Sequence, residues 1–354
     1  MNKVKSLYIH IPFCNKICDY CDFTKLQYFR NFAVSYLEAL KDELKSYPIK
    51  DLKTIYVGGG TPTALEDDLF EELLKIIDMY TNGVKEYTFE ANPESLSFNK
   101  IRLLKEHGVN RVSLGVQTTN DKILKTINRD HTFKQVQEAI KNLKEAGIDN
   151  INIDLILGLP HTSEKILKED LKNVLSLGVK HISCYGLTVN PHTVLFNKGF
   201  KEPEGDVIRN FYDIVEEGLV KNGFVHYEVS NWAKPGYQSE HNLTYWRNEQ
   251  YFGCGLGASG YINDIRYKNT VNLSQYLTRV FVNEKEQVSE RDKLTYQIML
   301  NLRTIEGLDI SFVKYKEKEI EELISGGLLI KKGNRLIPTY QGMMVLNQII
   351  LKLI

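Results

Sequence analysis

The sequence predicts an α/β protein: a partial (β/α)6 barrel, followed by a mixed extension and a small helical, winged-helix-like C-terminal domain. Short β-rich runs alternate with amphipathic helical stretches through the first half of the 354 residues. This alternation is typical of parallel strands joined by helical crossovers. Several helical stretches end in a glycine and an apolar residue, as helices do before the chain turns back. Six such units suit an open barrel, and a doubly wound sheet is the alternative.

Hydrophobic periodicity assigns each element of the barrel. The predicted strands are residues 7–11, 54–57, 86–90, 111–116, 150–157 and 181–187. The predicted helices are residues 32–46, 65–80, 99–107, 133–146 and 163–177. The glycines that end helices are Gly108, Gly147, Gly178 and Gly223. Residues 1–189 are therefore assigned to the barrel.

The remaining residues form two predicted segments. Residues 190–285 are richer in Gly, Asn, Tyr and Trp and are expected to cover the barrel mouth. A polar stretch, residues 283–290, is expected to be a linker. Residues 286–354 contain two helical patterns, at 291–302 and 313–324, a hairpin turning at Gly333-Asn334 and an apolar final helix, an order that resembles a winged helix. No basic recognition helix is evident, so we expect a lid or partner-docking domain and no nucleic-acid binding.

Composition narrows the class of protein. The formal net charge is zero, with 45 basic and 45 acidic residues, so no global field favours nucleic acid or anionic lipid. No apolar run reaches the roughly 20 residues of a membrane span, and the first residues lack the apolar core of a signal peptide. We therefore expect a cytoplasmic protein. Three of the five cysteines lie within eight positions, which favours metal binding over disulfides in such a chain.

Those three cysteines, Cys14, Cys18 and Cys21, predict a [4Fe–4S] cluster. Three thiolates on one loop can bind three irons and leave the fourth open for S-adenosylmethionine (SAM). Electron transfer from the cluster to the sulfonium would break a C–S bond and release a 5′-deoxyadenosyl radical. One alternative is a buried helix face, which the preceding Pro12 and the polar residues between the cysteines disfavour. Another is a zinc site, which would need a fourth ligand close by.

Polar and glycine residues lie where the predicted strands end. A Gly58-Gly59-Gly60 triplet followed by Thr61 lets bare backbone approach a ligand, although it would equally make a sharp turn. Glu90, Gln117 and Asp154 end three further strands, and ligand groups of α/β barrels gather at that face. Asp154 either faces a ligand or pairs with a base such as Arg129.

These features belong to an ordered set of motifs that resembles one known family. The set comprises Tyr8-Ile-His-Ile-Pro-Phe-Cys-x3-Cys-x2-Cys, Gly58-Gly-Gly-Thr-Pro-Thr, Asn92-Pro93, Gly115-Val-Gln117, Arg129-Asp-His131, Asp154-Leu-Ile-Leu-Gly-Leu-Pro160 and Glu228-Val-Ser-Asn-Trp232. Over essentially its whole length, the chain resembles the oxygen-independent coproporphyrinogen oxidase-like radical SAM proteins.

The resemblance implies a set of ligand contacts. Tyr8, Gly59 and Glu90 would contact the SAM bound to the cluster. The oxidase of this family binds a second SAM, and the residues it uses align with Tyr20, Gly60, Thr61, Gln117, Arg129 and Asp154. All six have suitable side chains here, so the number of SAM molecules and the occurrence of turnover stay open.

Two features separate the branches of this family. The oxidase, which oxidatively decarboxylates coproporphyrinogen III, has a further cysteine two residues after the third cluster cysteine, and a longer N-terminal arm. Here Phe23 holds that position and seven residues precede Tyr8, which resembles the haem chaperone branch. His241-Asn-Leu-Thr-Tyr245-Trp246 resembles a motif of that branch, in which the histidine is linked to haem binding.

A neutral imidazole is a common axial ligand of haem iron, so His241 is the predicted haem contact. A histidine packed beside Tyr245 and Trp246 at an interface is the alternative. The resemblance thus implies a protein that binds haem and inserts it into client proteins, expected to be respiratory, with transient contact with a membrane surface. The cluster and SAM would drive or gate transfer. The rivals are the oxidase itself and a radical enzyme acting on another substrate.

Overall fold

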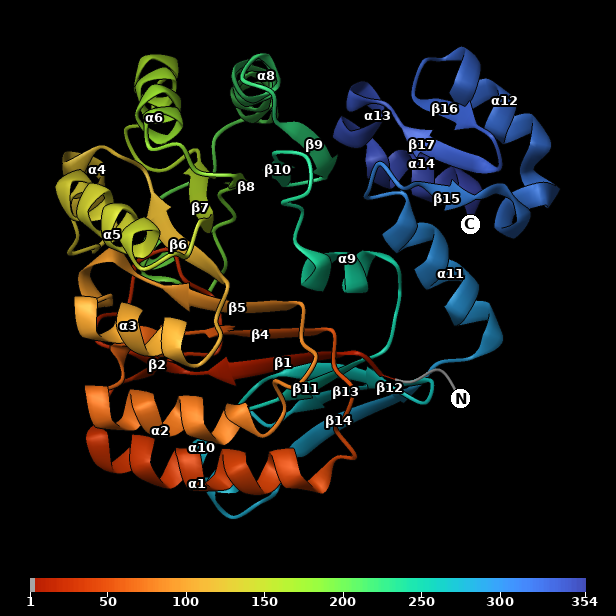
Figure 1. Ribbon diagram of the computed structural model, residues 1–354. Coiled ribbons are helices and arrows are strands. Elements are labelled where there is room, and N and C mark those ends of the chain that lie inside the picture. Colours follow the sequence, from red (N-terminus) through yellow and green to blue (C-terminus); the bar gives the residue numbers. More distant parts are fainter. Residues whose placement is uncertain (1–3) are drawn as a thin grey trace.

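The computed structural model describes residues 4–354, and its centre is a curved sheet with helices along the outer face (Figure 1). The central strands are parallel: β1 (Ser6–Ile11), β4 (Thr54–Gly59), β5 (Glu86–Ala91), β6 (Arg111–Gln117), β7 (Asn150–Leu157) and β8 (His181–Gly186). Between them run α1 (Arg30–Ser46), α2 (Asp67–Asp78), α3 (Phe98–Glu106), α4 (Asp121–Thr126), α5 (Phe133–Glu145) and α6 (Glu164–Ser176). The predicted partial (β/α)6 barrel is confirmed.

Short elements complete the barrel connections. They are β2 (Phe13–Cys14), β3 (Leu26–Gln27), and the 3₁₀ turns η1 (Pro62–Ala64) and η2 (Pro93–Ser95). The four glycines predicted to end helices all have a positive φ, between 64° and 81°, at Gly108, Gly147, Gly178 and Gly223. Because this conformation is open to glycine at little strain, those helix ends follow directly from the sequence.

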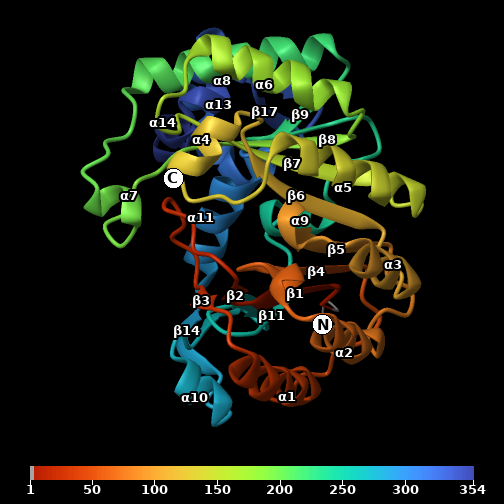
Figure 2. The same cartoon turned by 90° about the vertical axis from the view of Figure 1, so that its left-hand side faces the viewer.

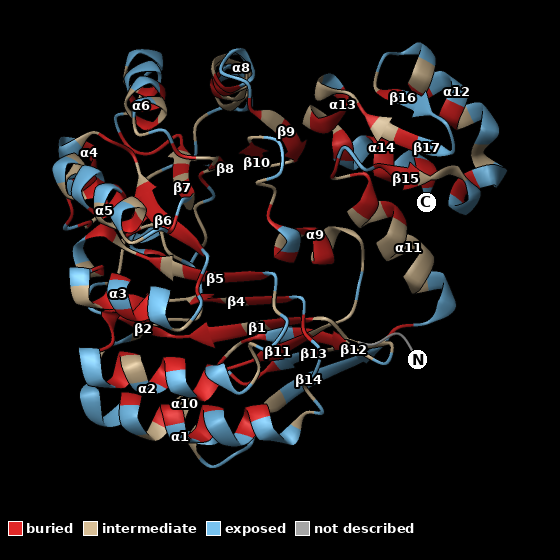
Figure 3. Cartoon of the chain, viewed as in Figure 1, coloured by how far each residue is buried: buried red, intermediate tan, exposed pale blue. Residues whose placement is uncertain are grey.

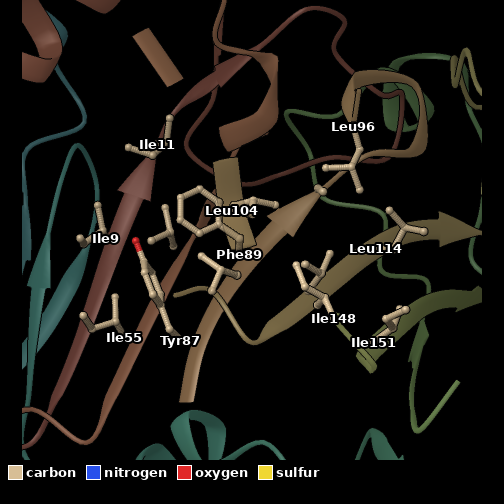
Figure 4. Packing of buried hydrophobic residues seen from close by; sticks show 14 of the residues in the cluster. Ile9, Ile11, Ile55, Tyr87, Phe89, Leu96, Leu104, Leu114, Ile148 and Ile151 are labelled. Atoms are coloured by element: carbon tan, nitrogen blue, oxygen red, sulfur yellow. The ribbon is translucent and has the colours of Figure 1, made fainter. Parts of the chain in front are cut away.

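The two faces of each barrel strand differ in polarity. Outward-facing residues such as Ile9, Ile55 and Phe89 are buried beneath the helices, and Figure 4 shows this packing. Residues that alternate with them point into the barrel and are largely polar: Ser6, Tyr8, His10, Thr54, Tyr56, Glu86, Thr88, Glu90, Arg111, Ser113, Asn152, Asp154, His181 and Ser183. Figure 3 shows that the strands are nevertheless buried along most of their length. The barrel interior is therefore a polar chamber inside an apolar shell.

The segment expected to cover the mouth is placed differently. After α7 (Val194–Asn197) and α8 (Gly205–Lys221) come β9 (Val225–Glu228), β10 (Asn231–Ala233), α9 (Glu240–Trp246), β11 (Tyr251–Cys254), β12 (Ser259–Ile262), β13 (Ile265–Asn269) and α10 (Leu273–Leu277). Strands β10 and β9 continue the sheet beyond β8, and β11, β12, β13 and β14 (Val282–Gln287) continue it beyond β1. Strands of this segment thus pair with β1 and β8, the two edge strands of the partial barrel, whose backbone groups would otherwise lack hydrogen-bond partners.

Of this segment, the region of α7 lies at the barrel mouth, the end that faces the viewer in Figure 2. There the backbone N–H of Leu195 donates to the carbonyl of Asp19, at 2.9 Å. The stretch 283–290 is not the linker that its polarity suggested, because most of it is β14. Its charged residues, such as Glu284 and Lys285, are exposed on an edge strand, where charge discourages pairing with another sheet.

The C-terminal part has its own core. It comprises α11 (Glu290–Asn301), β15 (Leu308–Asp309), η3 (Ile310–Lys316), α12 (Glu317–Ser325), β16 (Leu329–Lys332), β17 (Arg335–Pro338), α13 (Tyr340–Met344) and α14 (Leu346–Leu353). The hairpin turns at Gly333-Asn334, as expected. The helix expected at 313–324 starts instead as a 3₁₀ segment with non-helical angles at Val313. The domain limits at residues 189 and 285 stay a prediction.

Within residues 4–354, helices of membrane-spanning length and apolarity are absent.

Candidate functional site

A cavity of about 370 Å³ opens at the carboxyl ends of the barrel strands. Almost every residue predicted for the cluster and SAM lines it: Cys14, Cys18, Tyr20, Cys21, Gly59, Gly60, Thr61, Glu90, Gln117, Arg129 and Asp154. These residues come from six separate segments of the chain. The fold therefore brings together residues that the sequence could group only by their positions at strand ends.

The cysteine loop is held in place from both sides. Strands β2 and β3 pair in parallel and close the loop at its base. The backbone N–H of Asp19 donates to Ile127 O at 3.1 Å, and the Asn128 side chain donates to Ile17 O at 2.8 Å. The turn after α4 and the region of α7 thus hold the loop over the cavity.

The three thiols face one cavity and are not linked by disulfides. Within residues 4–354, no three His, Cys, Asp or Glu side chains converge on a point where one metal ion could sit. Burial raises the pKa of Cys14 to about 11, and a bound iron would shift such a thiol to the thiolate. Thiols spread around a common space are what a cubane needs, because each thiolate binds a different iron. This donor set fits a [4Fe–4S] cluster with one open iron.

Arg129 joins the cysteine loop to the barrel. Its Nη2 donates to Asn92 Oδ1 at 3.0 Å and to the carbonyl of Gly115, and its Nη1 lies 3.5 Å from Cys18 Sγ. The side chain is buried, and its Nε has no hydrogen-bond partner among the described residues. A guanidinium beside a thiolate ligand would offset the negative charge of the cluster.

Glu90 and the glycine triplet form the opposite wall. The carboxylate of Glu90 accepts hydrogen bonds from the Gly59 N–H at 3.0 Å and the Tyr56 hydroxyl at 2.7 Å. Burial raises its pKa to about 7. A Cβ at Gly58 would lie 2.6 Å from the Glu90 carboxyl carbon. A larger residue at position 58 would displace this carboxylate from its place in the cavity wall, where it could accept from an amino group such as that of SAM.

Asp154 faces the cavity and does not pair with Arg129. Its carboxylate accepts from Ser113 Oγ at 3.1 Å and Asn152 Nδ2 at 2.8 Å, and burial raises its pKa. Of the two roles considered for this acid, the structure favours the ligand-facing one. Nearby, Gln117 has φ of 68°, at a register shift between β6 and β7. A left-handed non-glycine residue at a strand end is a strained conformation of the kind that clusters at functional sites.

Tyr8 stands behind the cavity wall. Its hydroxyl lies 2.9 Å from His10 Nδ1, and His10 Nε2 lies 2.8 Å from the carbonyl of Thr24. Since a carbonyl only accepts, Nε2 carries the proton and Nδ1 accepts from Tyr8. A Cβ at Gly59 would strike the His10 ring at 2.6 Å. His10 therefore braces the glycine loop and the cysteine loop, a role that only the alternation of Tyr8 and His10 on β1 hinted at.

His241 lies at the other end of the barrel, on α9, and has no exposed surface. Its Nδ1 is 2.8 Å from Thr54 Oγ1, which donates onward to Ser6, so Nδ1 must be the donor of this pair. The Tyr245 hydroxyl then donates to Nε2, at 2.7 Å. Burial lowers the pKa of His241 to about 3. The imidazole is neutral, but both of its nitrogens are engaged.

Comparisons with known proteins agree with this geometry. The model of the Radical SAM superfamily matches residues 8–174. The haem chaperone HemW of Lactococcus lactis is 40% identical over 361 residues, covering 97% of this chain and 95% of the relative. HemW of Bacillus subtilis is 38% identical, covering 98% of each chain. This chain belongs to the HemW family.

A solved structure shares the fold of this chain. Coproporphyrinogen III oxidase (HemN) from Escherichia coli superimposes with a TM-score of 0.86, at 22% identity, covering 99% of this chain and 90% of that one. At that identity the likeness concerns the fold. HemW of Escherichia coli itself is 30% identical over 375 residues, covering 98% of this chain. The two branches therefore share one architecture, and individual residues must distinguish them.

Proposed function

We propose that the protein is a haem chaperone, which binds haem and delivers it to proteins that require it. The observation that carries this proposal is the similarity along nearly the whole chain to relatives named haem chaperone HemW. Two residue-level features support it: Phe23 stands where the oxidase resemblance requires a cysteine, and the motif from His241 to Trp246 is complete. Phe23 is 66% exposed at the cavity mouth, so no packing requirement explains its presence.

Cys14, Cys18 and Cys21 would hold the [4Fe–4S] cluster, with SAM on the open iron. A reduced cluster supplies an electron to bound SAM. The remaining work belongs to the protein. The Gly59 backbone and the Glu90 carboxylate would orient the amino group of SAM, and Arg129 would balance charge near Cys18. Asp154, held by Ser113 and Asn152, would fix a ligand hydroxyl or amine from the facing wall.

His241 is the proposed haem contact, and its burial sets a condition for that role. A fully buried imidazole reaches a haem only if α9 leaves its position in the barrel. The ring is already neutral, so no proton has to be removed before it binds iron. The Tyr245 hydroxyl on Nε2 is the group that the iron would displace.

The finer aspects of the function are also proposals. We propose that the clients belong to the respiratory chain and that the protein works in the cytoplasm, meeting membrane-bound clients by transient contact with the membrane surface. Neutral overall charge supports such weak contact, since no net charge holds the protein at an anionic lipid surface.

The rival function is oxidative decarboxylation of coproporphyrinogen III. The cavity supports it, because Glu90, Asp154 and Arg129, three residues proposed to contact SAM, all line it. The two functions make different demands on α9. A chaperone needs His241 to bind haem, whereas an enzyme working in the barrel mouth needs α9 only as a structural element.

An anaerobic haem titration of the cluster-reconstituted protein, followed in the Soret band, tests the proposal. We expect saturable, equimolar binding that is lost or spectrally shifted in His241→Ala. His181→Ala is the matched control, since His181 is also fully buried with both ring nitrogens bonded, to Asn152 and Tyr227. Equal effects of the two substitutions would reduce His241 to a structural residue. Absence of specific binding in the wild type would overturn the chaperone proposal.

A further inference from the structure

Helix α9 closes the amino-terminal end of the barrel, opposite the cluster cavity (Figure 1). Its first backbone N–H groups have no partner within the helix, as at any helix start. Here Glu86 of β5 takes them: it accepts from Glu240 N at 2.9 Å, from His241 N at 3.0 Å and from the Ser239 hydroxyl at 3.2 Å. The negative charge of a carboxylate at a helix N-terminus also interacts favourably with the helix dipole. The helix is thus docked by a barrel residue.

The side chain of His241 reinforces this docking. The Thr54 hydroxyl accepts from its Nδ1 and donates to Ser6 Oγ, at 2.9 Å. Ser6 Oγ in turn lies 3.0 Å from the Thr244 hydroxyl, one turn further along α9. Ser6 and Thr54, the first residues of β1 and β4, therefore contact the face of α9 that carries His241, the proposed haem contact.

One side chain touches both this helix and the SAM cavity. Tyr56 lies two residues beyond Thr54 on the inner face of β4 and lines the cavity. Its hydroxyl donates to Glu90, at 2.7 Å. Its ring lies against that of His241, with centroids 5.2 Å apart and planes at 33°. No other residue is needed to connect the two ends of the barrel.

We propose that Tyr56 couples occupancy of the SAM cavity to the docking of α9, and so to the availability of His241. A SAM amino group on Glu90 competes with the Tyr56 hydroxyl for the same carboxylate. Losing that hydrogen bond frees the Tyr56 ring, which stops bracing His241, and α9 undocks more often. The haem side of this coupling rests on the proposed function, whereas the effect of SAM on α9 does not.

The surroundings of α9 leave room for such movement. A second cavity, of about 350 Å³, lies between the end of the helix and the C-terminal domain, lined by Trp246, Asn301 and Phe312 among others. The contacts across it are polar: Arg247 pairs with Glu306, and the Asn301 side chain donates to Trp246 O. Exposed polar contacts of this kind are weaker than an apolar interface, so the helix is fixed mainly by the barrel.

Hydrogen exchange of residues 239–247 tests the coupling without haem and without turnover. The protein carries its oxidised cluster, no reductant is present, and SAM is added to saturation. One hydrogen bond is worth about 1 kcal/mol, so we expect exchange in α9 to become about fivefold faster with SAM. In Tyr56→Phe, exchange should be fast without SAM and unchanged by it. If SAM does not change the exchange rate of α9 in the wild type, the proposal is overturned, and this includes the case in which SAM does not bind.

Tyr87→Phe is the matched control. Tyr87 lies on the adjacent strand β5 but faces outward, it is buried, and its hydroxyl has no hydrogen-bond partner among residues 4–354. We expect this variant to respond to SAM as the wild type does. An identical SAM response in Tyr56→Phe and Tyr87→Phe would overturn the role of Tyr56.

A second variant approaches the coupling from the helix. Thr54→Val removes the contact with His241 without touching the cavity, since Thr54 is not among the residues that line it in the described chain. It should loosen α9, and because coupling is reciprocal it should also tighten SAM binding. A looser α9 with unchanged SAM affinity would contradict the coupling.

Haem titrations with and without SAM distinguish a failure of the Tyr56 coupling from a failure of the proposed haem chaperone function. If both hold, saturating SAM strengthens haem binding severalfold in the wild type and not in Tyr56→Phe. If SAM loosens α9 but haem does not bind, the coupling stands and the chaperone function fails. If haem binds to His241 with the same affinity in both conditions, the function stands and the coupling fails.

Discussion

A methyl group at Gly60 should disturb the cluster loop more than any other small change in the glycine triplet. A Cβ there would lie 2.7 Å from the carbonyl carbon and oxygen of Pro12 and 2.9 Å from Phe13 O. These are backbone atoms, so no side chain can rotate to make room. The Gly60 N–H also donates to Ile11 O at 2.9 Å, which prevents the two segments from separating. Overpacking of this kind costs about 1–3 kcal/mol.

The segment that must move leads directly into Cys14, so Gly60→Ala should lose both stability and iron. We expect a lower midpoint of urea unfolding under anaerobic conditions and less iron per chain after reconstitution than in the wild type. Gly205→Ala is the control, because among the described residues nothing lies within 4 Å of its Cβ position in the first turn of α8. It should be neutral or stabilising by up to about 1 kcal/mol. A Gly60→Ala protein with wild-type stability and iron content would refute this account of the glycine loop.

Three further predictions follow from single residues. Burial raises the pKa of Glu90 from 4.5 to about 7, so the folded protein holds a proton that the unfolded chain releases. The resulting stabilisation of the folded state is complete below pH 4.5 and is lost as the pH rises through 7. Between pH 5 and pH 8, the midpoint of urea unfolding should therefore fall less in Glu90→Gln than in the wild type. Parallel curves for the two proteins would contradict this. Glu86→Ala should lower the free energy of unfolding by about 1–3 kcal/mol, because buried N–H groups of α9 lose their acceptor. Unchanged urea unfolding would show that water replaces the Glu86 carboxylate as the acceptor. Phe23→Cys should leave iron per chain and stability unchanged, since residue 23 is exposed beside an already complete set of three thiols; a change in iron content would mean that position 23 takes part in cluster binding.

The barrel could be predicted closely because its signals are local. Strands such as Asn150–Leu157 alternate apolar and polar residues, and glycines such as Gly147 mark helix ends by a conformation that depends on few distant contacts. The edge strands β11 to β14 escaped prediction because their pairing is set by the open edge of β1, which lies far away in sequence. Strand β14 in particular reads as a linker, since its charges face solvent on an exposed edge.

The site divides in the same way. Glu90, Gln117 and Asp154 could be found from their places at strand ends, where parallel strands deliver side chains to one face. The position of His241 could not, because it depends on Glu86 and Thr54, which lie more than 150 residues earlier in the chain. The motif around His241 predicts a haem contact there without indicating that the folded chain encloses the side chain.

Haem delivery is the function that we propose for this radical SAM fold. The most direct test offers one anaerobic, cluster-reconstituted preparation both haem and coproporphyrinogen III, the latter with SAM and a reductant. We expect equimolar haem binding that depends on His241, passage of that haem to an added apo-haem protein, and no release of CO2 from coproporphyrinogen III. Release of CO2 without saturable haem binding would overturn the chaperone function and identify the protein as an oxidase.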